Sequence, residues 1–319
     1  MKQLVILEYF TAQSNIENNQ NTEIFEEALN ITDSIVKNFV KSDRIKNIIV
    51  LRNKNLKILN LNKVKYYYTN INVSFIDILK RLDSNYEVIL VAPETKEIYI
   101  NIFKITNKIL KIIGSSLNCI KIFSSKLKTT KVLNALKIPT VKTIKKEERL
   151  INYPFISKPE YGAGSDNVVL HKNKNHKIKK SFIFQKFYPG KKGSFLMLCK
   201  NGKNKVICCN EQIVKLEKNR INQIGCIMGG LENYRKEIEC LANKISREFD
   251  GLFGLIGVDI ILHKRKWIVL EINSRFTSSY CGIEKSYDAE TINAITNFYL
   301  NGELENINPK LLKKFKYIF

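Results

Sequence analysis

The chain has 319 residues, 44% of them hydrophobic and 26% charged, which excludes disorder throughout and allows two or three packed units. It contains no apolar run of the ~18–20 residues that a membrane span needs, and its seven cysteines form no C-x-x-C pair, which argues against a zinc site and a disulfide framework. The net charge of +23 comes from 44 Lys and 9 Arg spread along the chain, whereas base and phosphate recognition favours Arg.

The first 115 residues alternate short apolar runs with amphipathic stretches. The apolar part of MKQLVILEYF is too short for a signal peptide, so it predicts a first buried strand and a cytoplasmic protein. Further strands are predicted at 47–51, 64–69 and 86–94, and helices at 24–40 and 74–82. This alternation predicts a parallel α/β layer, and hence an N-terminal α/β domain over residues 1–115.

After residue 115 a helix is predicted at 126–137, ended by Ile138-Pro139. From residue 153 strand follows strand, in PFISKP, NVVL, SFIFQKFY, SFLMLC and KVICCN. A long amphipathic helix at 232–249 precedes two strands, 254–262 and 266–273, which the polar turn HKRK joins into a hairpin. We assign residues 116–185 to a central subdomain and 186–319 to a C-terminal one.

The hairpin carries the most informative polar residues. Glu271 and Asn273 are two apart on one strand and point to the same face, and pairing across the hairpin can bring Asp259 beside them. Such an all-oxygen cluster suits a hard cation such as Mg²⁺ and suits zinc poorly. Arg275 adds a cation close by. Ordinary polar positions on an exposed hairpin are the alternative for this pattern.

A glycine-containing loop follows the strand that ends at Lys158. Its residues are Gly162, Ala163, Gly164 and Ser165, and their backbone N–H groups could close over phosphates. A strand then leads to Gln185, Phe187 and Tyr188, which could line an adenine slot. A simple Gly-rich turn and aromatic core packing are the structural alternatives for these two segments.

The order of these parts resembles the ATP-grasp superfamily over nearly the whole chain. The resemblance implies an ATP-grasp fold of the α/β (α+β) class, with an N-terminal parallel α/β domain and two α+β subdomains that clasp the nucleotide. It implies two nucleotide-contacting lysines, Lys126 and Lys158, a phosphate lid at 162–165 and an adenine hinge from Gln185 to Tyr188. It also implies Mg²⁺ or Mn²⁺ on Asp259, Glu271 and Asn273, with Arg275 stabilising the transferring phosphoryl group of ATP.

A closer resemblance lies in three segments, LEYFTA, VAPET at 91–95 and EINSRFTSSYCG at 271–282. They are similar to the tyramine–L-glutamate ligases of methanofuran-type cofactor biosynthesis, in which the last segment reads E-I-N-P-R-x-T-T-S-Y. Ser274 stands here for the Pro and Ser278 for the second Thr. Ser125 replaces the usual Asp before the first lysine, Lys186 replaces an acidic residue, and Ala12-Gln13-Ser14 replaces a Gly-rich turn.

The resemblance implies an ADP-forming ligase that joins a carboxylate to an amine through an acyl phosphate. The expected partners are small-molecule substrates, with no nucleic acid and no membrane, and the oligomeric state is open, a homodimer being one option. A ligase for another amino acid or peptide pair, a catalytically dead nucleotide-binding module and a basic nucleic-acid-binding protein are the alternatives. The substrate candidates are residues at predicted strand ends and in the last segment: Glu8, Tyr9, Glu94, Ser278, Ser279 and Tyr280.

Overall fold

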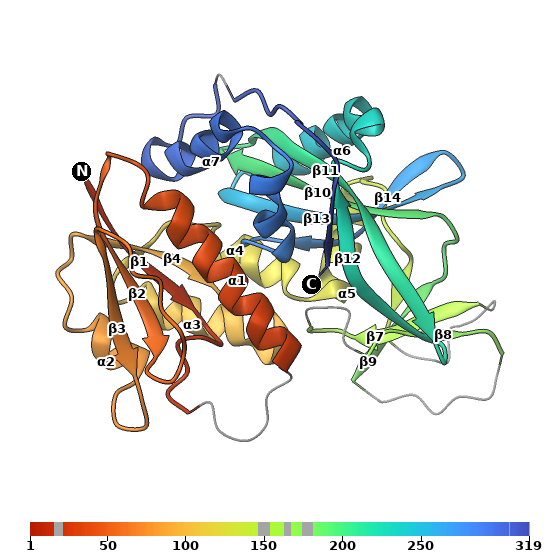
Figure 1. The fold of residues 1–319 in the computed structure, drawn as a ribbon. Helices are drawn as coiled ribbons and strands as arrows, with labels where there is room; N and C mark the ends of the chain where they lie inside the picture. The colour runs from red at the N-terminus through yellow and green to blue at the C-terminus, as the bar shows by residue number, and fades with distance from the viewer. Residues whose placement is uncertain (16–21, 146–153, 163–166, 174–180, 306, 319) are drawn as a thin grey trace.

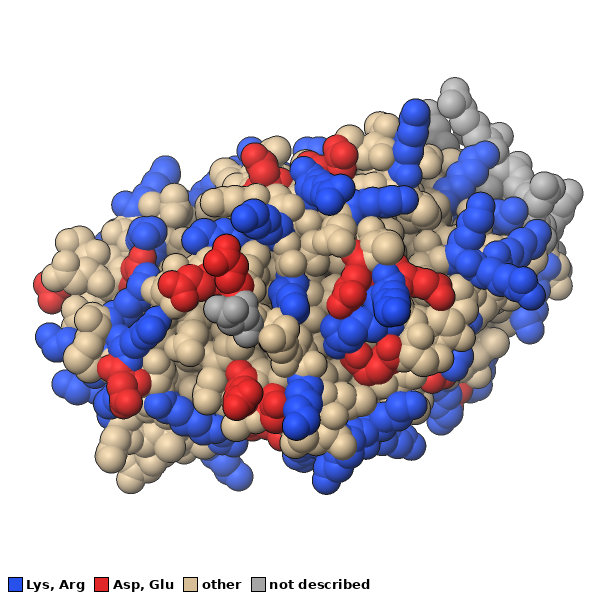
Figure 2. Space-filling view, turned by 90° about the horizontal axis from the view of Figure 1, so that it is seen from above, with Lys and Arg blue, Asp and Glu red and all other residues tan. Residues whose placement is uncertain are grey.

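Two β-sheets with helices packed against them make up the protein (Figure 1). The structure, a computed structural model, describes residues 1–15, 22–145, 154–162, 167–173, 181–305 and 307–318. None of the described helices combines the length and the apolar character needed to cross a bilayer. Lys and Arg occur across the whole face shown in Figure 2, with Asp and Glu set among them.

The N-terminal sheet has five parallel strands in the order β3-β2-β1-β4-β5. The strands are β1 (Lys2–Glu8), β2 (Ile45–Asn53), β3 (Val64–Thr69), β4 (Tyr86–Val91) and β5 (Lys111–Ile112). The helices that accompany it are α1 (Thr22–Phe39), α2 (Phe75–Leu79), η1 (Thr95–Glu97) and α3 (Ile98–Thr106). The predicted parallel α/β layer is thereby confirmed.

Both faces of β1 are buried, which explains its uninterrupted apolar run. Leu4 belongs to a core with Ile35 of α1, whereas Val5 belongs to a core with Phe103 of α3. The strand ends at Glu8 rather than at the predicted Phe10, because the backbone turns there and Ala12 N–H donates to the Glu8 carbonyl.

The larger sheet has ten strands, and β14-β13-β10-β11-β12-β8-β7-β9-β6 is the order of its path, with β15 beside β12. They are β6 (Thr143–Ile144), β7 (Phe155–Pro159), β8 (Val169–His171), β9 (Phe182–Lys186), β10 (Lys191–Lys200), β11 (Lys203–Glu217), β12 (Arg220–Met228), β13 (Gly254–His263), β14 (Lys266–Asn273) and β15 (Phe315–Ile318). Only one described pair, Arg220 with Val169, joins β12 to β8. The strands β6 to β9 therefore form a small lobe with a narrow connection to the rest.

Helices complete the core on both sides of this sheet. They are α4 (Leu117–Phe123), α5 (Lys126–Ala135), η3 (Glu232–Tyr234), α6 (Arg235–Glu248), η4 (Ser278–Lys285) and α7 (Ala289–Asn301). Ile238, Leu241, Ala242 and Ile245 of α6 are buried in one core with β10 and β13, as their spacing predicts. The predicted helix 232–249 begins as a 3-10 turn and becomes α-helical at Arg235.

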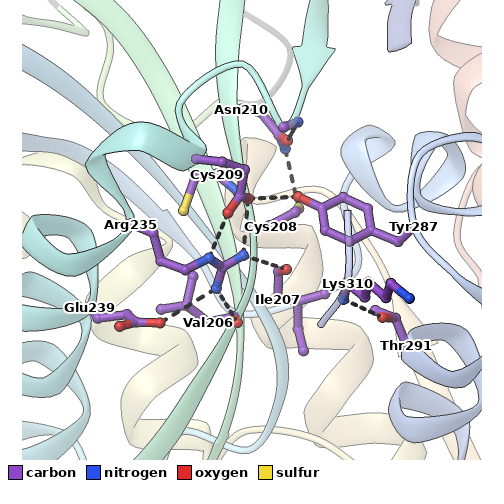
Figure 3. Close-up of polar contacts among 12 residues, drawn as sticks. Val206, Ile207, Cys208, Cys209, Asn210, Arg235, Glu239, Tyr287, Thr291 and Lys310 are labelled. Carbon is purple, nitrogen blue, oxygen red and sulfur yellow. Dashed lines mark hydrogen bonds and ion pairs between the residues drawn. The ribbon is translucent and has the colours of Figure 1, made fainter. Parts of the chain in front are cut away.

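A polar network around Glu232 connects three parts of the C-terminal half. Figure 3 shows Arg235, Cys209 and Tyr287, which belong to it. Arg235 donates to the carbonyls of Val206 and Ile207 at 2.9 and 3.1 Å and pairs with the Glu232 carboxylate. The same carboxylate accepts from the backbone N–H of Cys209 at 2.9 Å and the hydroxyl of Tyr287 at 2.7 Å. The network thus holds α6, β11 and the segment after η4 in one arrangement.

Glu232→Ala should destabilise the fold much more than Tyr287→Phe. The first change leaves a partly buried guanidinium and a backbone N–H without their acceptor, which should cost about 3 kcal/mol. The second removes one hydrogen bond and should cost about 1 kcal/mol. Urea unfolding of both variants measures the two free energies, and equal losses would show that Glu232 holds no more than the tyrosine.

Candidate active site

A cavity of about 690 Å³ lies where the small lobe, the β13–β14 hairpin and α1 meet. It brings together most of the residues singled out from the sequence. Its lining includes Lys126, Lys158, Gly162, Gln185, Phe187, Tyr188, Asp259, Glu271, Asn273, Arg275, Ser278 and Ser279. Ala163, Gly164 and Ser165 of the expected phosphate lid lie outside the described residues.

The hairpin supplies the acidic part of the cavity. Asp259 on β13 is directly opposite Glu271 on β14, and Gly257 is opposite Asn273, so the three oxygen-bearing side chains share one face. The register shifts between Asp259 and Ile260, which leaves Leu270 as an extra residue that also lines the cavity. A bulge of this kind bends the strand beside a site and re-aims its side chains.

Two lysines face these carboxylates from other elements. Lys126, at the start of α5, donates to Glu271 Oε1 at 2.8 Å and to the Gly162 carbonyl at 2.6 Å. The Ser125 side chain caps the same helix by accepting from the N–H of Lys128. Asp, the residue expected at this position in relatives, can form the same helix cap. Lys158 is buried at the end of β7.

Burial and the like charge nearby set the ionisation of this cluster. Burial, followed by the Glu271 carboxylate, raises the pKa of Asp259 to about 7. Burial would also raise the pKa of Glu271, but Lys126 and Lys158 outweigh it and hold that pKa below its usual value. Burial lowers the pKa of the Lys158 ammonium to about 8, against the opposing pull of Glu271.

These residues fit a divalent cation through their oxygen atoms. Gln212, which sequence analysis did not single out, donates to Asp259 Oδ1 at 2.7 Å and so orients it. The Ser194 hydroxyl lies on the strand position beside Asp259 and is buried without a hydrogen-bond partner among the described residues. The described residues contain no group of three or more His, Cys, Asp or Glu side chains that could hold a metal, so a cation here would rely on two carboxylates, amide oxygen and substrate oxygens.

Arg275 lines the cavity but is held from behind by Glu94. Its Nε and Nη2 donate to the two Glu94 oxygens at 2.8 and 2.7 Å, and Nη1 donates to the Phe276 carbonyl at 3.1 Å. Burial alone would lower the pKa of this guanidinium, but Glu94, with Glu27 further away, raises it above its ordinary value. A guanidinium has five N–H donors, so two remain beyond these three contacts.

The residues expected to form a purine slot also line the cavity. Gln185 lies on β9, and its amide nitrogen donates to Thr143 Oγ1 at 2.9 Å, so its side chain is oriented by β6. Phe187 and Tyr188 follow in the lining. Lys186 places its ammonium 5.8 Å from the centre of the Tyr188 ring, which adds a cation to this wall where the relatives were expected to have an acid.

Four substrate candidates from the sequence do not line the cavity. The Glu8 carboxylate accepts from the backbone N–H groups of Phe10 and Thr11 and closes the turn after β1. Tyr9 packs against Phe10 and the core behind it. Glu94 is occupied by Arg275, and Tyr280 is buried against Phe276 with its hydroxyl accepting from Asn38. Their local roles explain why adjacency in sequence did not place them at the cavity.

Residues 123–279 match the family described as the ATP-grasp domain. Together with the two-sheet fold, the match identifies an ATP-grasp domain in this chain, and the ligases among its relatives support a ligase enzyme that uses ATP. The fold is shared with an ATP-grasp superfamily protein from Archaeoglobus fulgidus, with a TM-score of 0.75 and 20% identity over 97% of this chain and 91% of that one.

The chain is similar to two curated proteins that have the same enzyme name. It is 28% identical to the tyramine–L-glutamate ligase of Methanocaldococcus fervens over 266 residues, 82% of this chain and 78% of that protein. It is 24% identical to the tyramine–L-glutamate ligase of Methanocaldococcus jannaschii over 296 residues, 88% of this chain and 85% of that protein. The fold is also that of an L-amino acid ligase from Bacillus licheniformis, with a TM-score of 0.63 and 16% identity over 97% of this chain and 78% of that one.

Asp259→Asn should abolish turnover and yet raise the melting temperature of the ligand-free protein at pH 8. The pKa of Asp259 is raised in the folded state, so its ionisation costs folding free energy that is fully present above about pH 7 and disappears as the pH falls toward the unfolded value. Asparagine keeps the shape without the charge. The gain in melting temperature should therefore shrink between pH 8 and pH 5, and a variant less stable than wild type at pH 8 would contradict this electrostatic assignment.

Glu94→Gln should lower kcat although residue 94 does not line the cavity. Without the paired charge, Arg275 loses its fixed direction, and we expect a loss of about tenfold, against roughly a hundredfold for Arg275→Lys. Because Glu94 acts through Arg275, combining the two changes should cost little more than Arg275→Lys alone. Independent, multiplying losses in steady-state kinetics would show that Glu94 has a separate role.

Proposed function

We propose that this enzyme condenses L-glutamate with tyramine, using Mg-ATP and releasing ADP and phosphate, in the cytoplasm and in the synthesis of a methanofuran-type cofactor. The observation that carries the proposal is the similarity to two tyramine–L-glutamate ligases over 82% and 88% of the chain, which extends beyond the ATP-grasp domain. We further propose that residues 1–115, 116–185 and 186–319 act as the three parts of the fold.

The cavity supports this chemistry residue by residue. Lys126 and Lys158 would hold the phosphates of ATP, and Phe187 and Tyr188 would flank its purine. Asp259, Glu271 and Asn273 would hold a divalent cation, which supplies positive charge to the transferring phosphoryl group. The free donors of Arg275 would face the oxygen atoms of the acyl phosphate, where charge develops.

Ser278 and Ser279 follow Arg275 in the chain and line the same cavity. Their hydroxyl groups can hydrogen-bond a carboxylate or an amine, so we place the organic substrates beside them and the nucleotide beside Phe187 and Tyr188. In this arrangement a carboxylate oxygen of glutamate attacks the terminal phosphorus of ATP and ADP departs. The amine, after its ammonium group has lost a proton, then attacks the acyl carbon and phosphate departs.

The proposal is tested by ADP release with Mg-ATP and L-glutamate in the presence of tyramine, dopamine, D-alanine or no amine. Tyramine should give the highest rate, and the amide product should appear in a one-to-one ratio with ADP. Glu271→Gln, which removes one charge at the cation site and keeps its shape, is the inactive control. If another acid and amine pair is turned over and tyramine does not increase the rate, the proposed substrate pair is wrong, although the enzyme is still a ligase.

A further inference from the structure

One carboxylate in the cavity has no part in the machinery described so far. Among the described lining residues the acidic side chains are Asp259, Glu271 and Glu27, and only Glu27 lies outside the hairpin. It is carried by α1, a helix of the N-terminal sheet. Among the described residues Glu27 forms no ion pair. Arg275 is nevertheless close enough for the Glu27 charge to help raise the pKa of its guanidinium, whereas Asp259 and Glu271 interact with the charges of Lys126 and Lys158.

Glu27 is held in place by the segment that the sequence linked to substrate recognition. The hydroxyl of Ser278 donates to Glu27 Oε1, and η4, which begins at Ser278, packs against α1. A carboxylate oxygen can accept more than one hydrogen bond, so this contact fixes the side chain and leaves acceptor capacity toward the cavity.

Two apolar side chains line the same cavity. Ile24 precedes Glu27 by three residues, lies on the same face of α1 and also lines the cavity. Ile318, at the end of β15, lines it as well. A carboxylate and aliphatic side chains in one cavity match a ligand that has one ammonium group on an apolar body.

We propose that Glu27 binds the ammonium group of the amine substrate and is a specificity-determining residue of the enzyme. This inference rests on the proposed function and deepens it. The α-carboxylate of glutamate is a poorer occupant of this position, because its negative charge would meet that of Glu27. The amine should therefore approach from the α1 side, with its ring beside Ile24.

The test separates amine binding from activation of the acid. In Glu27→Gln the Ser278 contact can form but the charge is absent, so the KM for tyramine should rise about tenfold or more, with the KM for glutamate unchanged. Hydroxylamine, which is uncharged at neutral pH, traps the acyl phosphate as glutamyl hydroxamate. The rate of hydroxamate formation should be the same in wild type and variant.

Two further variants serve as controls. Glu26→Gln removes the same charge from the neighbouring, exposed position of α1 and should leave the KM for tyramine unchanged. Glu27→Asp keeps the charge on a shorter side chain and should restore most of the affinity. A wild-type KM for tyramine in Glu27→Gln, or a rise in the KM for glutamate instead, would overturn the inference.

The proposed function fails in a different way. Its failure would appear as wild-type enzyme that forms no hydroxamate from glutamate and ATP, whatever residue stands at position 27. If hydroxamate forms normally and tyramine binding is insensitive to Glu27, the acid and the ligase chemistry stand and only the place of the amine is wrong.

Discussion

The arrangement of this protein depends on two carboxylates that face each other across one hairpin. Asp259 and Glu271 occupy opposite positions of β13 and β14, and neither can be ionised at low cost in a protein interior without positive charge nearby. That charge comes from Lys126 on α5 and Lys158 on β7. The acidic pair therefore has both of its lysine neighbours only when the small lobe, α5 and the hairpin are assembled. Its ionisation depends on the tertiary structure, as does its role as a candidate cation site.

A second ion pair extends this assembly to the N-terminal sheet. Glu94 comes three residues after β4, at the carboxyl edge where parallel sheets gather their ligand-binding groups. Here it binds Arg275, 181 positions later in the chain. Since bidentate pairing fixes the plane of the guanidinium, the parallel sheet determines the direction in which Arg275 presents its remaining donors to the cavity.

The sequence predicted the elements with strong periodicity, and the candidate residues with strong local patterns line one cavity. The strand pair 254–262 and 266–273 was predicted nearly to the residue, because a polar turn separates two almost wholly apolar runs. By contrast, Glu27 and Gln212 carry no local signal, since Glu27 is one of two adjacent glutamates on an amphipathic helix and Gln212 lies within a half-exposed strand. Only the packing of α1 on η4 and of β11 beside β10 shows which way they point.

The candidates that do not line the cavity have a related physical explanation. Glu8, Glu94 and Tyr280 stand in segments that resemble the ligase family. Each is instead saturated by a local or long-range partner: backbone N–H groups for Glu8, Arg275 for Glu94, Asn38 and aromatic neighbours for Tyr280. The resemblance to a family indicates which segments are candidates for the site. Whether a side chain in such a segment is available to a ligand depends on the hydrogen bonds that it already makes.

The net charge of +23 conceals a mixture of both signs within the cavity. Lys126 and Lys158 act on the hairpin carboxylates Asp259 and Glu271, whereas Glu27, on α1, accepts a hydrogen bond from the Ser278 hydroxyl. If Glu27 binds the amine as we propose, its charge attracts a cationic substrate toward α1, while the two lysines attract the phosphates of an anionic nucleotide toward the hairpin. Opposite charges on these two elements would therefore help to direct the two ligands to different parts of the cavity.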